Sequence, residues 1–145
     1  MRAVVQRVKS GRVTVGDKLV SEIGRGMVIL LGIGHDDNEE SVRYLADKIS
    51  NLRIFEDTAG KMNLSLLEVG GEAIVVSQFT LYADTSKGRR PSFINAATPE
   101  SASVLVNAFV EKLSAYGVPT QKGEFGEHMI VEIVNDGPVT IILER

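Results

Sequence analysis

The sequence predicts a mixed α/β protein in which stacked, largely antiparallel β-sheets lie under a layer of two helices. Runs of β-branched and alternating apolar residues fill the first third and the end of the chain, as is typical of strands. Two longer segments between them repeat their apolar residues with the period of a helix. With 145 residues and 43% hydrophobic content, the chain has the size and composition of one domain spanning residues 1–145.

The N-terminal third is predicted to form consecutive antiparallel strands. The segments "AVVQRV", "RVTV", "KLVSEI" and "MVILLGI" have strand patterns, and glycine-containing turns precede the last two. A helix is then expected over residues 38–51, because acidic residues stand at its start, where the helix dipole favours them. The apolar residues of this segment fall on one helical stripe: Val42, Leu45, Ala46, Ile49 and Leu52.

The rest of the chain is predicted to contain a buried strand, a second helix and a final hairpin. The β-branched run in "EAIVVSQFTLYAD" indicates the strand. Thr98 as N-cap and Pro99 at the first helical position mark the start of the helix, which ends before Gly117. Strands at about residues 129–134 and 139–144 flank "NDGP", whose Asp-Gly pair is a strong hairpin signal. The proline makes this tip more rigid than a connection needs, so it is a candidate for contact with something outside its own sheet.

Composition excludes several functions. With no cysteine, the chain has no thiol nucleophile and no thiolate zinc site, and we expect neither a metal nor another cofactor. The net charge of -3 argues against coating nucleic acid through bulk electrostatics, although recognition of one nucleic-acid end stays open. The apolar run over residues 27–33 is too short to span a bilayer, and no signal-peptide pattern begins the chain. We therefore expect a cytoplasmic protein without a membrane partner.

Common catalytic motifs are missing from the sequence. It has no G-x-S-x-G elbow, Walker loop, H-E-x-x-H or G-x-G-x-x-G, and we interpret His35 and His128 as surface residues rather than general bases. The "SQFTL" segment, residues 77–81, is either a strand emerging into water or a pocket rim that presents hydroxyls and backbone N–H groups to a ligand. The basic segment "TSKGRRPSF" is either a solvated loop or a phosphate site.

Four motifs resemble one known family. They are "MNL" at residues 62–64, "SQFTL" at 77–81, "RPSF" at 90–93 and "NDGPVT" at 135–140, in the order seen in D-aminoacyl-tRNA deacylases. The opening strands resemble that family too, so the resemblance covers essentially the whole chain. It implies a homodimeric enzyme with a three-layer fold that needs no metal or other cofactor. Such an enzyme removes D-amino acids, and also glycine, from tRNA and rejects L-aminoacyl-tRNA, a form of chiral proofreading.

The same resemblance implies a catalytic pocket lined by Ser77, Gln78, Phe79 and Thr80. Backbone N–H groups around Phe79 and Thr80 would stabilise the oxyanion. Thr80 is either a nucleophile or a binding group. The sequence around it supplies no obvious base, so we favour water activated by the terminal ribose hydroxyl of the tRNA.

The other implied site residues surround the pocket. Gly137 and Pro138, joined by a cis bond, would enter the pocket of the partner subunit as a chirality gate, and Arg7 would hold that loop by its carbonyls. Three basic residues would meet the phosphates of the tRNA acceptor end: Lys87, Arg89 and Arg90.

Two rival functions stay open at this point. One is a β-rich binding module whose rigid loop grips a partner without chemistry, and the other is a hydrolase of a different acyl substrate. Incubation with D-tyrosyl-tRNA and L-tyrosyl-tRNA separates them, because only a deacylase of the resembled family releases the D-amino acid with a strong preference.

Overall fold

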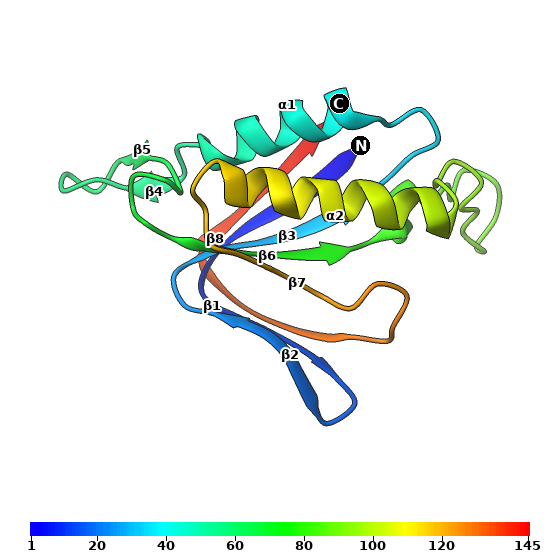
Figure 1. Ribbon diagram of the computed structural model, residues 1–145, viewed down its shortest axis with the longest axis horizontal. Coiled ribbons are helices and arrows are strands. Elements are labelled where there is room, and N and C mark those ends of the chain that lie inside the picture. Colours follow the sequence, from blue (N-terminus) through cyan, green and yellow to red (C-terminus); the bar gives the residue numbers. More distant parts are fainter.

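The computed structural model describes every residue from Met1 to Arg145 (Figure 1). Two adjacent helices, α1 (Glu39–Ser50) and α2 (Pro99–Ala115), cover one face of a large sheet. The strands of that sheet are β1 (Arg2–Val15), β2 (Lys18–Ile23), β3 (Gly26–Gly32), β6 (Glu72–Ser77), β7 (Thr120–Lys122) and β8 (Ile130–Glu144). Their order is β2-β1-β3-β6-β7, and β8 pairs with β1. A second, small sheet consists of β4 (Phe55–Glu56) and β5 (Met62–Leu64).

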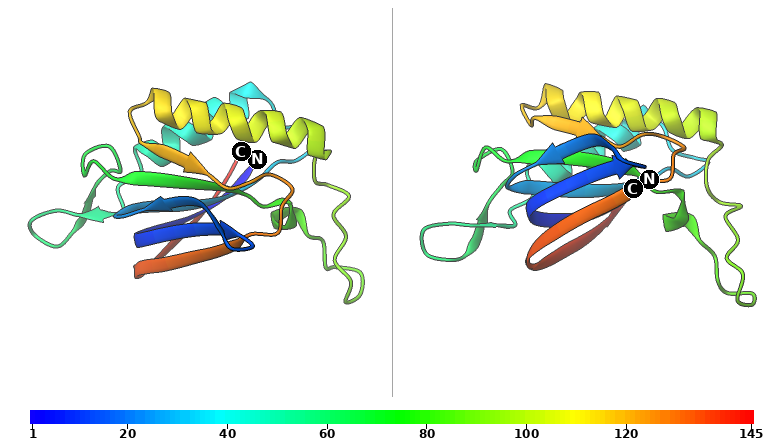
Figure 2. Two further views of the ribbon diagram at one scale, coloured as in Figure 1. Left: turned by 60° about the horizontal axis from the view of Figure 1, so that its bottom comes forward. Right: turned by 90° about the horizontal axis from the view of Figure 1, so that it is seen from below.

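Strands β1 and β8 are long enough to belong to two layers (Figure 2). The first half of β1 pairs with β3 and the second half with β2. One hydrophobic core lies between the helices and the central strands, and a second core lies on the other face of these strands. The residues of this second core are Val8, Val13, Ile23, Val28, Ile74 and Val76. The predicted arrangement of stacked strands under a helical layer is therefore confirmed.

The two layers of strands lie close together at Gly11. A β-carbon added there would lie 2.7 Å from Cγ2 of Val28 and 3.6 Å from Cδ1 of Ile74, both on the central strands. A side chain at this position would therefore push the layers apart.

At the centre of the sheet, β3 and β6 run parallel. Both are apolar along almost their whole length, because the two cores bury both of their faces. The predicted strand over "EAIVVSQFTLYAD" is too long: β6 ends at Ser77 and is followed by a short 3₁₀ helix, η1 (Phe79–Tyr82). The reason is that Ser77 pairs with Leu31 and β3 ends one residue later at Gly32, so no partner strand remains.

Both helices begin as the sequence predicts. The side chain of Asn38 caps α1 by accepting from Glu40 N at 2.9 Å and Ser41 N at 3.3 Å. Thr98 caps α2 and Pro99 is its first residue. Most of each predicted apolar stripe is buried against the sheet. Neither helix is both long and apolar enough to cross a membrane.

Residues 130–144 form one strand, so the predicted C-terminal hairpin is wrong. The parts of β8 before and after "NDGP" both pair antiparallel with β1 and never with each other. Asn135 lies opposite Val8 and Thr140 opposite Gln6. Residues 136–139 therefore stand opposite a single residue of β1 and form a bulge, which we call the β8 bulge. The long β1 offers a partner to both halves, and this pairing prevails over the local turn signal.

Candidate active site

The β8 bulge presents a rigid tip. The bond between Gly137 and Pro138 is cis, and both residues are exposed. Gly137 has a φ of 138°, a conformation that residues with a side chain rarely adopt. Asn135 closes the base of the bulge, since its Oδ1 accepts from Val139 N at 2.9 Å and its Nδ2 donates to Thr140 Oγ1 at 3.2 Å. The hydrogen bonds of Asn135 thus fix the base of the tip, while Gly137 and Pro138 themselves are exposed.

Arg7 stabilises the bulge from inside the protein. Its Nε donates to the Asp136 carbonyl at 2.9 Å and lies 3.6 Å from the Asp136 carboxylate. Its Nη1 donates to the Ile54 carbonyl at 2.6 Å. Arg7 is only 5% exposed, and a buried guanidinium is costly unless it is matched in this way. The structure therefore places Arg7 against the carbonyl that precedes Gly137.

The "SQFTL" segment leaves the sheet and turns. Gln78 N donates to the Leu31 carbonyl at 2.8 Å, which fixes the start of the turn to the end of β3. The Gln78 side chain does not cap η1 but donates to the hydroxyl of Thr80. The first N–H groups of η1, those of Phe79 and Thr80, have no partner within that turn. The hydroxyl of Thr80 has an amide as its hydrogen-bond partner and not a base.

A largely apolar cavity of about 360 Å³ opens beside this turn. Phe79 and Phe93 lie in its wall with their rings edge to face, 4.9 Å apart between centroids. The remaining wall comes from the end of β3, from β6, from the segment leading into α2, from α2 itself and from the loop between β7 and β8: Leu31, Ile33, Ser77, Gln78, Ala96, Ala97, Pro99, Ala102, Val106, Phe125 and Gly126. Phe125 was not predicted as a site residue, and its place in a glycine-containing polar loop was the available signal.

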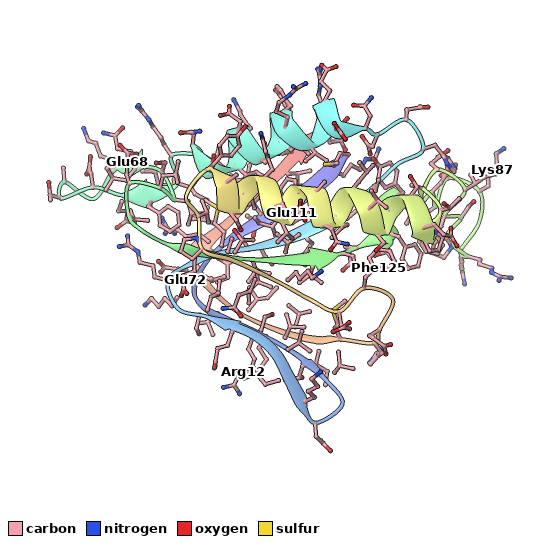
Figure 3. The ribbon with its side chains drawn as sticks, viewed as in Figure 1. Arg12, Glu68, Glu72, Lys87, Glu111 and Phe125 are labelled. Atoms are coloured by element: carbon pink, nitrogen blue, oxygen red, sulfur yellow. The ribbon has the colours of Figure 1, made fainter.

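The three basic residues of the predicted phosphate site occupy an exposed loop at the same end of the molecule. Figure 3 shows Lys87 at the end that also carries Phe125. Two hydrogen bonds between Asp84 and Ser92, of 2.8 and 2.9 Å, close this loop at its base. Neither Arg89 nor Arg90 nor Lys87 forms an ion pair with an acidic side chain. Their positive charges remain available to an anionic ligand.

The two histidines have different surroundings. His35 Nε2 lies 2.7 Å from the Ile94 carbonyl and has a structural contact. His128 is exposed and lines a second hollow of about 260 Å³ together with Ser77, Gln78 and Phe79. Both histidines were predicted to be surface residues, and His128 shares a hollow with residues 77–79, which that prediction did not include.

The β8 bulge and the turn formed by residues 77–82 lie at opposite ends of the sheet. Across the strands, the base of the bulge is in register with Gly26 and Glu72, at the start of β3 and β6. Ser77 is at the other end of β6, about 16 Å away at 3.3 Å per residue. In both views of Figure 2 the bend of β8 is opposite the loop that joins β6 to α2, and in Figure 3 Glu72 and Phe125 mark the two ends. One chain therefore does not bring its own tip to its own cavity.

Tyr82, the last residue of η1, carries a perturbed phenol. Burial, and then the nearby charge of Asp37, raises the pKa of Tyr82 from its ordinary 10.0 to about 12. Its hydroxyl donates to Asp37 Oδ2 at 3.2 Å. Between pH 10 and 12 the folded state keeps a proton that the unfolded state has lost, so stability falls as pH rises through this window.

We expect this fall to be shallower in Tyr82→Phe, which has no phenol to titrate at this position. Urea denaturation of both proteins across the window measures the effect, since lysines and arginines titrate alike in both. Equal slopes of unfolding free energy against pH would contradict the assignment.

Fold and site together define an enzyme of one class. A cavity at the carboxyl ends of parallel strands is a common ligand position. Beside the cavity, the N–H groups of Phe79 and Thr80 have no partner within the turn, and the hydroxyl of Thr80 has no base as its partner. Such a site suits hydrolysis of an ester that is already activated. The profile of the D-Tyr-tRNA(Tyr) deacylase family matches residues 4–144. The chain belongs to the D-Tyr-tRNA(Tyr) deacylase family, and it is a hydrolase of aminoacyl-tRNA ester bonds.

Its relatives span nearly the whole chain. The D-aminoacyl-tRNA deacylase of Desulforudis audaxviator (strain MP104C) is 60% identical, covering 99% of this chain and 97% of the relative. That of Clostridioides difficile (strain 630) is 57% identical with the same coverage. The family and enzyme class expected from the four motifs are confirmed.

Solved structures resemble the chain as well. The c-Myc DNA Unwinding Element Binding Protein is 44% identical with a TM-score of 0.95, covering 100% of this chain and 99% of that one. A probable eukaryotic D-amino acid tRNA deacylase has a TM-score of 0.82 at 20% identity, covering 98% of this chain and 97% of that one. This second likeness shows the fold alone.

Proposed function

We propose that this protein acts in the cytoplasm as a single-domain chiral proofreading enzyme that releases D-amino acids, and also glycine, from tRNA and rejects L-aminoacyl-tRNA. The observation that carries this proposal is the combination, within one chain of the deacylase family, of an apolar cavity beside residues 77–80 and an exposed tip at Gly137. The cavity is large enough for the end of an aminoacylated nucleotide, and the tip supplies backbone that can approach a substrate closely.

Catalysis would depend on positioning. The ester carbonyl would lie over the start of η1, where the N–H groups of Phe79 and Thr80 stabilise the negative oxygen of the tetrahedral intermediate. Each well-placed donor of this kind contributes about 3 to 4 kcal/mol. Gln78 orients Thr80 through their hydrogen bond, and Ser77 lines the cavity wall. Water would be activated by the ribose hydroxyl next to the ester.

Chirality would be selected by exclusion. Backbone carbonyls at the Gly137 tip would bind the substrate amino group and approach its Cα so closely that an L side chain has no space. Glycine has no side chain to exclude, so glycyl-tRNA would also enter the site and be hydrolysed. Arg7 would keep the carbonyls in place through its bond to Asp136.

The tip lies at the opposite end of the sheet from the turn of its own chain, about 16 Å away along the strand direction at 3.3 Å per residue, so it would enter a cavity in another subunit. We therefore expect a two-fold dimer, the simplest closed form in which each tip enters the other cavity. Sedimentation equilibrium should give twice the chain mass of 15.7 kDa. An active monomer of 15.7 kDa would contradict the cross-subunit gate.

Thr80→Ala should retain much of the deacylase activity. The hydroxyl of Thr80 contacts the amide of Gln78 and no base that could make it a nucleophile. The backbone N–H of residue 80, the proposed donor, is present in alanine too. Single-turnover hydrolysis of D-tyrosyl-tRNA measures the effect, and a fall to the uncatalysed rate in a folded, tRNA-binding variant would assign the nucleophile to Thr80.

Lys87, Arg89 and Arg90 would bind phosphates of the acceptor end, since their loop lies at the cavity end of the molecule. Such contacts position the tRNA and weaken with salt.

The decisive experiment compares D-tyrosyl-, L-tyrosyl- and glycyl-tRNA as substrates. We expect rapid release of D-tyrosine and glycine, while L-tyrosyl-tRNA decays at its uncatalysed rate. Equal release of both enantiomers would leave a deacylase without a chiral gate. Binding of all three without release would favour a binding module.

A further inference from the structure

The η1 turn needs support from outside itself. It has four residues, and Phe79 and Thr80 at its start are exposed. Its start is tied to the sheet by the bond from Gln78 N to the Leu31 carbonyl. An exposed segment with few contacts opens readily, whereas oxyanion donors must stay in place to be effective. The far end of the turn therefore depends on side chains from other elements.

Arg2, the first residue of β1, contacts that far end. Its Nη1 donates to the Leu81 carbonyl at 2.9 Å, and its guanidinium carbon lies 4.7 Å from the centre of the Tyr82 ring. Its Nε lies 3.0 Å from the carboxylate of Glu144 on β8, which fixes the direction of the side chain. One guanidinium thus joins the turn to two strands of the sheet.

Tyr82 locks the turn against the end of β3. Its hydroxyl donates to Asp37, whose side chain is 5% exposed and also accepts from Gly34 N at 2.7 Å. A β-carbon at Gly34 would lie 2.7 Å from the Tyr82 hydroxyl oxygen, so the phenol rests directly on glycine backbone. Asp37 also pairs with the α-ammonium group of Met1. The phenol of Tyr82 is therefore held by Asp37 and by the backbone at Gly34.

The contacts of Gly34 and Ile33 extend to other residues that line the cavity. Gly34 forms a β-bridge with Ala96, and Ala97 N donates to the Ile33 carbonyl at 2.9 Å. Ala96 and Ala97 line the same cavity as Phe79. A shift of Tyr82 would thus disturb cavity-lining residues outside the turn as well as the turn itself.

We propose that Arg2 and Tyr82 are positioning residues for deacylation, which hold the oxyanion donors of η1 in register with the cavity. This inference rests on the proposed function. Neither side chain touches the substrate in this role, since both act through the backbone of the turn. Their loss should slow the chemical step and leave tRNA binding largely unchanged, because misplacement of catalytic groups by about 1 Å costs on the order of a hundredfold in rate.

Single-turnover hydrolysis of D-tyrosyl-tRNA, with enzyme in excess and well below the melting temperature of each variant, tests the proposal. We expect Tyr82→Phe and Arg2→Met to lower the rate constant on the order of tenfold while the half-saturating enzyme concentration changes less than about twofold. Arg2→Lys, which can still donate to the Leu81 carbonyl, should recover part of the loss.

Two matched variants control for the chemistry of the substitutions. Tyr44→Phe alters an exposed tyrosine that also has an arginine over its ring, at 4.9 Å, and Arg12→Met breaks an exposed ion pair on β1. Both should hydrolyse at the wild-type rate. Wild-type rates in Tyr82→Phe and Arg2→Met would overturn the positioning role alone. No release of D-tyrosine by the wild-type protein would instead overturn the proposed function and this inference with it.

Discussion

Gly137→Ala should hydrolyse D-tyrosyl-tRNA about a hundredfold more slowly than the wild-type protein, because a displacement of the substrate by about 1 Å costs a factor of that order in rate. The added β-carbon would lie 2.7 Å from Val139 Cγ2, 2.9 Å from Val139 N and 3.2 Å from Arg7 Nη2. The backbone of the tip must therefore move away from the position in which Arg7 and Asn135 hold it. The carbonyls that would face the substrate Cα move with it. Single-turnover rates of the two proteins measure the loss.

The same substitution should also lower stability. Residue 137 has a φ of 138°, which is a strained conformation for alanine and lowers the free energy of unfolding by about 1 to 3 kcal/mol. Gly16→Ala is the matched control, because Gly16 also has a positive φ, of 56°, but has open space around it in the β1–β2 turn. That variant should melt earlier than the wild-type protein and keep its activity. If Gly137→Ala hydrolyses D-tyrosyl-tRNA at the wild-type rate, the bulge is a structural feature of β8 and not a gate.

A tRNA whose terminal ribose carries hydrogen in place of the 2′-hydroxyl should be a very poor substrate. The only hydrogen bond of the Thr80 hydroxyl is to an amide, so no base activates this hydroxyl, and we propose that the neighbouring ribose hydroxyl activates water instead. General acid–base assistance of this kind contributes about 10² to 10⁴ in rate. We expect a loss in that range for D-tyrosyl-tRNA prepared with a terminal 2′-deoxyadenosine.

Three measurements serve as controls for that result. A 2′-deoxy substitution at the preceding nucleotide changes the same chemistry one position away and should leave the rate unaltered. The uncatalysed decay of each ester must be subtracted, and competition against unmodified substrate should show that the 2′-deoxy tRNA still binds. Full activity with the modified tRNA would return the role of nucleophile or base to the protein, where Thr80 and His128 would be the residues to substitute next.

Local patterns predicted the helices and most strands because those elements depend on neighbouring residues. Asn38, Thr98 and Pro99 mark helix starts through contacts within a few positions. The C-terminal hairpin was predicted wrongly because its outcome depends on β1, more than a hundred residues earlier in the chain. A turn signal describes what a segment can do alone, and it does not include a distant strand that pairs with both of its flanks.

The candidate site also combines features that local sequence predicts with features that depend on distant parts of the chain. The motifs pointed to residues 77–80 and to the glycine-proline tip as candidate site segments, since each is a contiguous segment with unusual residues. Strands β4 and β5 pair with each other, and they were missed because two and three residues are too few to show a strand pattern. Strand β7 and the cavity wall from Phe125 were missed because their partner strand and neighbours come from elsewhere in the chain. The distance between tip and turn is a property of strand register, and no local pattern contains it.

That distance has a genetic consequence. In the proposed dimer each cavity combines the turn of one chain with the tip of the other, so a chain with an altered tip harms its partner's site and leaves its own intact. When such a chain is expressed beside a chain with an altered turn, a mixed dimer contains one site built from two unaltered parts. Two inactive alleles would then complement each other, whereas an altered tip expressed beside the wild-type chain would be partly dominant.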